Sequence, residues 1–154
     1  MTHRFSWILP QKLAVGSFPR RTTSASMLRR QGITAILCLT EPAEKSVPHE
    51  IEHGFVWQRV PIPDGFTGGK PSEAQFTQAL DILHRWFTKS HVVYVHCLAG
   101  VGRSASVCSL YVAQSQGMDL GAAISLVKQQ HQYANPDPHQ IEVMHRFLAS
   151  MAAS

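Results

Sequence analysis

The sequence predicts an α/β protein in which helices flank a central, mostly parallel sheet. Three observations support this fold class: short apolar runs alternate with helical patterns, one of these runs (33–39) is rich in branched residues, and residues 103–151 are helical in pattern. The chain has 154 residues, 44% hydrophobic and 16% charged, which suffices for one sizeable core. We therefore expect a single catalytic domain over 1–154.

The first half of the chain contains most of the predicted strands. Residues 6–9 and 12–15 are expected to form an opening hairpin, and a helix over 23–31 is expected to end at Gly32. The branched run 33–39 is typical of a buried strand. A second strand is predicted over 55–60, before a turn-rich loop at 61–70.

The second half contains one further strand and four helices. The helix predicted over 72–88 places its apolar residues on one face: Phe76, Ala79, Leu80, Leu83 and Trp86. Residues 92–95 form the third strong strand. The remaining helices are expected over 103–116, 119–131 and 137–151. This order of elements is the basis of the predicted α/β fold.

Charge and cysteine content restrict the class of protein. With 14 Lys and Arg against 10 Asp and Glu, the net charge of +4 favours anionic partners, but the basic doublets 20–21 and 29–30 are too short for a nucleic-acid-binding arm. The three cysteines lack zinc or disulfide spacing, which favours the reducing cytoplasm. We find neither a signal peptide nor a membrane-spanning run. We expect a cytoplasmic monomer without a membrane or nucleic-acid partner.

The segment 96–104, His-Cys-Leu-Ala-Gly-Val-Gly-Arg-Ser, lies between a buried strand and a helix. Backbone N–H groups at a helix N-terminus are unpaired and the helix dipole is positive there, so such a loop binds anions. Gly100 and Gly102 allow the backbone to curl around a phosphate. We predict a phosphate-binding loop formed by the following residues: Leu98, Ala99, Gly100, Val101, Gly102 and Arg103.

The same loop supplies reactive side chains. The field that binds phosphate also stabilises a thiolate, which makes Cys97 a candidate nucleophile. The Arg103 guanidinium can hold two phosphate oxygens, and Ser104 can hydrogen-bond the departing sulfur. The alternative is that Cys97 is a buried structural thiol. A cysteine, two glycines and an arginine at fixed spacing after an apolar strand favour the catalytic interpretation.

Cleavage of a phosphate ester also needs a proton donor for the leaving oxygen. Asp64 is the best candidate, although Pro63, Asp64 and Gly65 equally fit a plain turn. Glu73 follows Ser72 in a predicted capping box and is set aside.

The histidines suggest no metal site. Residues 49–53 match H-E-x-x-H, but Pro48 and Gly54 limit that segment to about one and a half turns, and no third ligand follows. We expect neither metal nor cofactor. His96 is expected to fix the loop through backbone hydrogen bonds, or to be a buried structural residue. The others are expected at the surface or in the core: His84, His91, His131, His139 and His145.

With these residues in place, the sequence resembles the protein tyrosine phosphatase superfamily, and most closely its small atypical dual-specificity (VHZ-like) members. The resemblance covers nearly the whole chain and includes residues 5–10, 39–41, 62–64 and 96–104. The cysteine loop lies late, after the acid loop, unlike in low-molecular-weight tyrosine phosphatases, and rhodaneses have a shorter loop. The resemblance implies a protein-tyrosine-phosphatase-like fold and a cysteinyl-phosphate intermediate. It also implies these roles: Cys97 as nucleophile, Arg103 as phosphate ligand, Ser104 as helper of thiolate departure, and Asp64 as acid and then base.

The expected substrates are phosphotyrosine and, in addition, phosphoserine and phosphothreonine in proteins. The segment 129–136 lacks an arginine that many relatives have there, and Asn135 and Gln140 are only weak candidates for contacts to substrate or water. The loop contains no lysine beside Cys97, which disfavours inositol phosphates. The alternatives are a phosphate-binding module without turnover and a phosphatase acting on lipid or RNA. The presence of Cys97, Arg103 and Asp64 favours turnover.

Overall fold

The computed structural model describes residues 3–153, and its centre is a five-stranded sheet of order β1-β2-β5-β3-β4. The strands are β1 (Phe5–Leu9), β2 (Leu13–Gly16), β3 (Ala35–Cys38), β4 (Val56–Arg59) and β5 (Val93–His96). β1 pairs with β2 in antiparallel fashion, and every other pairing is parallel. The predicted α/β class with a mostly parallel sheet is confirmed.

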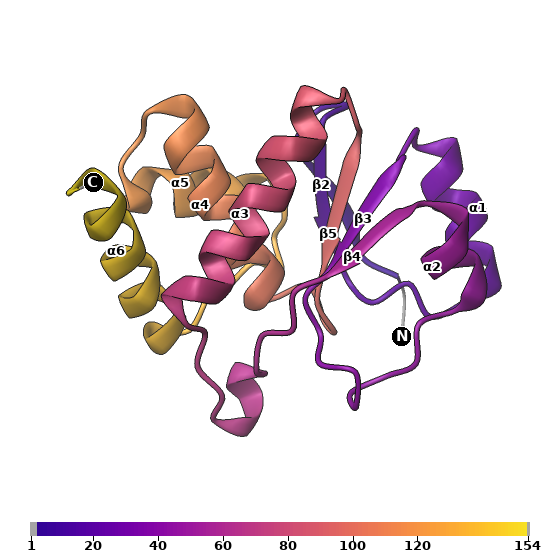
Figure 1. Ribbon diagram of the computed structural model, residues 1–154, viewed down its shortest axis with the longest axis horizontal. Helices are drawn as coiled ribbons and strands as arrows, with labels where there is room; N and C mark the ends of the chain where they lie inside the picture. Colours follow the sequence, from indigo (N-terminus) through magenta and orange to yellow (C-terminus); the bar gives the residue numbers. More distant parts are fainter. Residues whose placement is uncertain (1–2, 154) are drawn as a thin grey trace.

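The helices cover both faces of this sheet, as Figure 1 shows: α1 and α2 lie on one side and α3 to α6 on the other. They are α1 (Thr22–Arg30), α2 (His49–Gly54), α3 (Glu73–Thr88), α4 (Arg103–Gln116), α5 (Leu120–Gln130) and α6 (Pro138–Ala152), with a 3₁₀ turn η1 (Gly65–Thr67). All the helices predicted from periodicity are present. The strand predicted over 33–39 is shorter, because the Ile33 amide donates to Leu28 O at the end of α1.

Alternation along the strands divides the core into two parts. On the α3–α6 side, Leu37, Val95 and Cys97 belong to the larger buried cluster. On the α1–α2 side, Ile36 and Tyr94 pack in the smaller one, against Ala25, Leu28 and Ile51. Because neighbouring strand residues point to opposite faces, Cys97 is directed toward α4 while His96 is directed toward the other layer.

The carboxyl ends of the parallel strands meet at one edge of the sheet, where ligands bind in open α/β folds. β5 lies between β2 and β3, with His96 paired in register to Gly16 on one side and to Cys38 on the other. The segments that follow these three strands therefore converge around Cys97. Among the described residues, no helix combines the length and apolar character needed to cross a bilayer.

Candidate active site

The loop after β5 is held from outside through its carbonyl oxygens. Every carbonyl from Cys97 to Val101 accepts a hydrogen bond: Cys97 O from His96 Nδ1 (3.0 Å), Leu98 O from Phe18 N (2.9 Å), Ala99 O from Arg4 Nη1 (3.0 Å), Gly100 O from His131 Nε2 (2.8 Å) and Val101 O from Asn135 N (2.8 Å). Because the N–H and C=O of a peptide unit point in opposite directions, the amides are left facing the inside of the loop. The loop can therefore surround an anion with N–H donors.

Gly100 is required by the tight course of this loop. Its φ of +75° lies in the left-handed region, and a Cβ there would come within 2.7 Å of the Gly16 carbonyl carbon. A side chain would therefore introduce both backbone strain and a steric overlap with β2.

The Cys97 thiol lies at the base of the loop, beside the N-terminus of α4. Its Sγ is 3.2 Å from Ser104 Oγ, and both side chains are buried. α4 begins at Arg103 without a side-chain cap on its first turn, so its N–H groups face the loop. The positive end of the helix dipole favours negative charge on the sulfur or on a bound phosphate.

Arg103 is held in a fixed orientation by acceptors on the loops after β3 and β4. Its Nη1 and Nη2 donate to the two carboxylate oxygens of Glu44 at 2.7 and 2.8 Å, and Nη1 also donates to Ile62 O at 2.8 Å. Within the described chain these bonds use three of the five guanidinium N–H groups. Nε–H and one Nη2–H remain for two oxygens of a phosphate.

Glu44 was missed by sequence reasoning, although it is the main partner of Arg103. A turn after β3 positions it: Glu44 N donates to Glu41 O at 3.0 Å, and the Glu41 amide donates back to Glu44 Oε2. Burial would raise the pKa of Glu44, but the hydrogen bonds from Arg103 and from the Glu41 backbone lower it overall. The sequence offered only one sign of this role, an acidic residue shortly after a buried strand. An ordinary solvent-exposed glutamate would look the same in the sequence.

Asp64 lies at the start of η1, on the loop after β4. Its Oδ1 accepts from Phe66 N at 3.0 Å, so the plain turn predicted from sequence is present. Its Oδ2 is 3.8 Å from Arg103 Nη2, and both residues line the same pocket. The turn and the site are thus compatible, because each uses a different carboxylate oxygen.

These groups border a pocket of about 510 Å³. It is lined by residues of the acid loop, the cysteine loop and the start of α6: Asp64, Gly65, Phe66, Cys97, Leu98, Ala99, Val101, Gly102, Arg103, Asn135, Asp137 and Gln140. Asn135 and Gln140, weak candidates from sequence, both lie in this lining. Gln140 is buried and closes a capping box with Asp137 at the start of α6, which fixes its side chain near Gly102.

The other two cysteines lie outside the pocket. Cys38 pairs in register with His96, and its Sγ is 3.2 Å from Thr40 Oγ1. Burial raises the pKa of Cys38, but His96 and Thr40 lower it to about 6 overall. Burial raises the pKa of Cys108 on α4 far above its usual range. Only Cys97 of the three lines the pocket.

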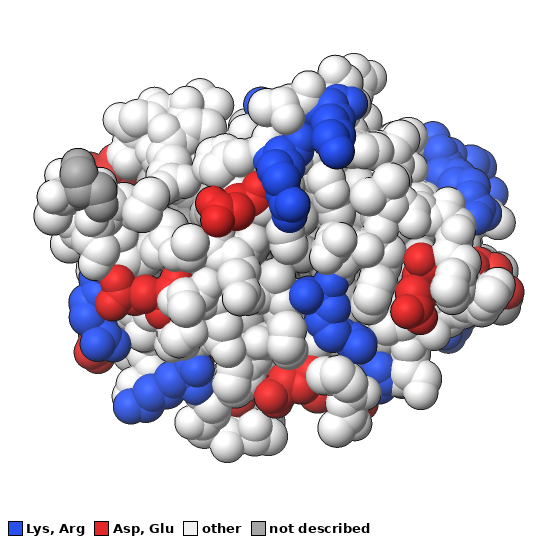
Figure 2. Space-filling model, viewed as in Figure 1, with Lys and Arg blue, Asp and Glu red and all other residues white. Residues whose placement is uncertain are grey.

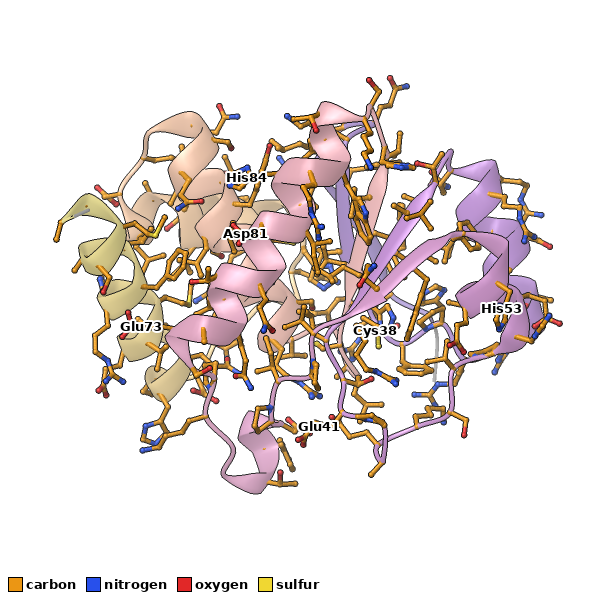
Figure 3. The ribbon with its side chains drawn as sticks, viewed as in Figure 1. Cys38, Glu41, His53, Glu73, Asp81 and His84 are labelled. Carbon is orange, nitrogen blue, oxygen red and sulfur yellow. The ribbon has the colours of Figure 1, made fainter. Side chains whose placement is uncertain are left out.

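The residues set aside in the sequence lie away from the pocket lining. Figure 3 shows Glu73 at the start of α3 and His53 on α2, whereas Glu41 lies in the loop that follows β3. The Ser72–Gln75 capping box is present, and Glu73 accepts from Ser150 Oγ at 2.9 Å. The rings of His49 and His53 contact each other at a tilt of 34°, with their centroids 4.4 Å apart. In the described part of the chain, no three His, Cys, Asp or Glu side chains are grouped for a metal ion.

Comparison with known proteins agrees with this geometry. A family model described as the catalytic domain of dual specificity phosphatases matches residues 15–148. The chain is 27% identical over 146 residues to phosphatidylglycerophosphate phosphatase PTPMT2 of Arabidopsis thaliana, covering 94% of this chain and 64% of that protein. It is 30% identical over 118 residues to human dual specificity protein phosphatase 7, covering 75% of this chain and 27% of that protein.

The fold is shared with the human tyrosine phosphatase-like serine/threonine/tyrosine-interacting protein. Its crystal structure superposes with a TM-score of 0.85 at 21% identity, covering 96% of this chain and 97% of that one. The chain belongs to the dual-specificity phosphatase family, and the predicted membership of the protein tyrosine phosphatase superfamily is confirmed. It spans less than two thirds of the length of the curated relatives named above.

Proposed function

We propose that this chain is a cysteine-dependent phosphatase acting on phosphorylated protein side chains, phosphotyrosine first. The observation that supports this most strongly is the loop whose carbonyls are all bonded outward, with Cys97 at its base and Arg103 at its end. A phosphate-binding module without turnover would need the loop alone. The additional alignment of Asp64 and Ser104 with this loop favours turnover.

In the first step, the Cys97 thiolate attacks phosphorus while the loop amides and Arg103 stabilise the phosphate oxygens. An S–P bond forms and the bond from phosphorus to the substrate oxygen breaks. Asp64, protonated on Oδ2, gives its proton to the leaving oxygen. The products are the dephosphorylated side chain and a cysteinyl phosphate.

In the second step, water attacks the phosphorus of the cysteinyl phosphate. The Asp64 carboxylate accepts a proton from this water, and the S–P bond breaks to release inorganic phosphate. Ser104 Oγ, 3.2 Å from Sγ, donates a hydrogen bond to the departing thiolate. The thiolate and the protonated Asp64 are thereby restored for another cycle.

The pocket lining favours an aryl phosphate. Phe66 is 99% exposed at the pocket mouth, where its ring can contact the ring of a phosphotyrosine. Arg103 is the one cation among the lining residues, and it is accompanied by two carboxylates, Asp64 and Asp137. A substrate with several phosphates would bring further negative charge to a site that has little to balance it.

We further infer one catalytic domain over residues 1–154, acting as a cytoplasmic monomer without metal or cofactor. In the proposed steps Arg103 and the loop amides stabilise the phosphate oxygens, Asp64 transfers the protons and Cys97 is the nucleophile, so no step uses a metal ion. The relation to PTPMT2, named as a phosphatidylglycerophosphate phosphatase, makes a lipid substrate the second candidate.

The test is one series of kcat/KM measurements. Phosphotyrosine, phosphoserine and phosphothreonine peptides of matched sequence are compared with phosphatidylglycerophosphate, phosphoinositides and RNA 5′-phosphates. We expect the phosphotyrosine peptide to give the highest value. A lipid or RNA substrate cleaved more efficiently than every peptide would overturn the assignment to protein substrates.

A further inference from the structure

A second pocket, of about 550 Å³, lies where the chain leaves β2 and enters α1. It is lined by three arginines, a histidine, three hydroxyl side chains and two apolar residues: Arg20, Arg21, Arg30, His3, Ser17, Thr23, Ser24, Phe18 and Met27. None of these lining residues is acidic. The chemistry of the pocket therefore suits an anion that arginine forks and hydroxyls can hold.

The surroundings add positive charge to this pocket. The first turn of α1 contains no acidic residue, and its residues Thr23 and Ser24 face the pocket. A helix N-terminus with this composition favours a negative ligand. The last turn of α1 contains Arg29 and Arg30, and Figure 2 shows blue side chains gathered over this helix. Burial lowers the pKa of His3, so the arginines supply the formal charge.

The basic pocket described above and the catalytic pocket around Cys97 are connected by a backbone hydrogen bond between their lining residues. Phe18 lines the first and Leu98 the second, and Phe18 N donates to Leu98 O at 2.9 Å. Arg21 is three residues from Phe18, and Leu98 is next to Cys97. Backbone geometry therefore places the Cα atoms of Arg21 and Cys97 within roughly 21 Å, about six residues of extended peptide.

We propose that the basic pocket binds an acidic or phosphorylated residue located within about six positions of the phosphorylated residue in the same peptide substrate. This inference rests on the proposed function and specifies its substrate class further. The catalytic pocket has one cation and two carboxylates in its lining, so it offers little to a second anion. Arg21 and Arg30 of the basic pocket are exposed, so their guanidinium groups can reach a second anion on the substrate.

A peptide fits this surface better than a lipid membrane. The two apolar residues of the basic pocket are not exposed: Phe18 is buried and Met27 is partly buried. The large exposed apolar residues of the described chain lie elsewhere, at Val56, Phe66, Tyr133 and Met151. Membrane docking would need exposed apolar side chains next to the basic ones, whereas a peptide carboxylate or phosphate needs only the arginines.

The test uses phosphotyrosine peptides with a single glutamate or phosphoserine placed at each position up to six residues before or after the phosphotyrosine. A neutral peptide is the reference. We expect the anion at the favoured position to raise kcat/KM about fivefold or more at low ionic strength, and the gain to fall as salt is added. The double variant Arg21→Ala/Arg30→Ala should lose this gain.

The matched control is Arg85→Ala/Lys89→Ala, which removes two charges from the end of α3 and should keep the gain. A wild-type enzyme without positional preference, or equal loss in both double variants, would contradict the proposal. Faster turnover of phosphoinositide vesicles that depends on Arg21 and Arg30, without a peptide effect, would assign the pocket to membranes instead.

Two further readouts separate this proposal from the proposed function. Hydrolysis of p-nitrophenyl phosphate tests the catalytic chemistry, and both double variants should retain it. The dissociation constants of the same peptides for the Cys97→Ser chain test the basic pocket without turnover. Tighter binding of the acidic peptide by Cys97→Ser supports the basic pocket as a binding site, even if catalysis fails. Adding Arg21→Ala/Arg30→Ala to Cys97→Ser should abolish this difference in affinity. Equal affinities for acidic and neutral peptides would overturn it.

Discussion

At the scale of single residues, the two carboxylates near Arg103 have different tasks. Glu44 binds Nη1 and Nη2 of Arg103 at 2.7 and 2.8 Å, whereas Asp64 approaches Nη2 only to 3.8 Å. The first geometry fixes the guanidinium, and the second leaves a carboxylate oxygen available to the substrate. We therefore expect substitutions at these positions to have different kinetic signatures.

Replacing Asp64 removes the proposed proton donor. Asp64→Asn should lower kcat about 10²–10⁴-fold for phosphopeptides. The loss should be much smaller for p-nitrophenyl phosphate, because a good leaving group needs little protonation. Asp137→Asn is the matched control, since asparagine also caps α6, and any loss there should be the same for both substrates. Equal large losses in Asp64→Asn would mean that another group donates the proton.

Replacing Glu44 should affect both activity and pH dependence. In Glu44→Gln, Arg103 loses its charged partner, and we expect roughly 1.5–3 kcal/mol less stability at neutral pH. The pKa of Glu44 is lowered in the folded state, so this contribution is present above the unfolded pKa of about 4.3 and is lost as pH falls through the folded value. The stability difference between wild type and Glu44→Gln should therefore shrink below about pH 4.3.

Denaturant unfolding at several pH values measures this difference, and Glu41→Gln is the control in the same loop. kcat/KM should also fall at least tenfold in Glu44→Gln, because Arg103 is no longer held toward the phosphate. If the two variants have the same stability at every pH, the Glu44–Arg103 pair is not the structural support described above.

At the scale of elements, the cysteine loop depends on segments far apart in the sequence. Its carbonyls are bonded by residues from the start of the chain, from the segment after β2 and from the end of α5: Arg4, Phe18 and His131. The Nε2–H of the neutral His131 ring donates to Gly100 O, so its Nδ1 accepts from Ser6 Oγ at 2.7 Å, and this bond links β1 to the loop. The loop shape is therefore a property of the assembled sheet edge.

A substitution at Gly100 tests whether the loop needs this backbone path. Gly100→Ala would place a Cβ against the backbone of Gly16 in a residue with φ of +75°. We expect a loss of about 1–3 kcal/mol in stability and a fall in kcat/KM of about 10²-fold. Gly117→Ala is the control, because φ is +63° there and no atom lies within 4 Å of the added Cβ. Full activity in Gly100→Ala would show that the loop tolerates a different path.

The difference between local sequence signals and contacts made only in the folded sheet explains which parts of the structure were predictable. Periodicity located α3 and α4 within a residue of their ends, since apolar spacing is a local signal. The cysteine loop also gave a local signal, because Cys97 and Arg103 are only six residues apart. Glu44, Arg4 and Phe18 were not predicted as partners of this loop, because their roles arise only when β2, β3 and β5 lie side by side.

At the scale of the whole molecule, binding of an anion should stabilise the fold. The loop joins β5 to α4 and is bonded to the N-terminal segment, so an occupant that binds only the folded state raises stability. Inorganic phosphate at 100 times its Kd should add about 2.7 kcal/mol, which corresponds to a rise in Tm of roughly 5–10 °C.

Thermal unfolding with phosphate measures this shift, with chloride at equal ionic strength as the reference. Cys97→Ser should keep most of the shift, because the amides and Arg103 remain. Arg103→Ala should lose most of it. A shift that survives Arg103→Ala would place the phosphate elsewhere on the molecule.

The covalent intermediate provides the most direct test of the central claim. The wild-type chain is mixed with a phosphotyrosine peptide and quenched in acid within the first turnovers, and its peptides are analysed by mass spectrometry. We predict a phosphate on Cys97, absent in Cys97→Ser, which should bind the peptide without turning it over. Phosphate on another residue, or full turnover by Cys97→Ser, would contradict the mechanism.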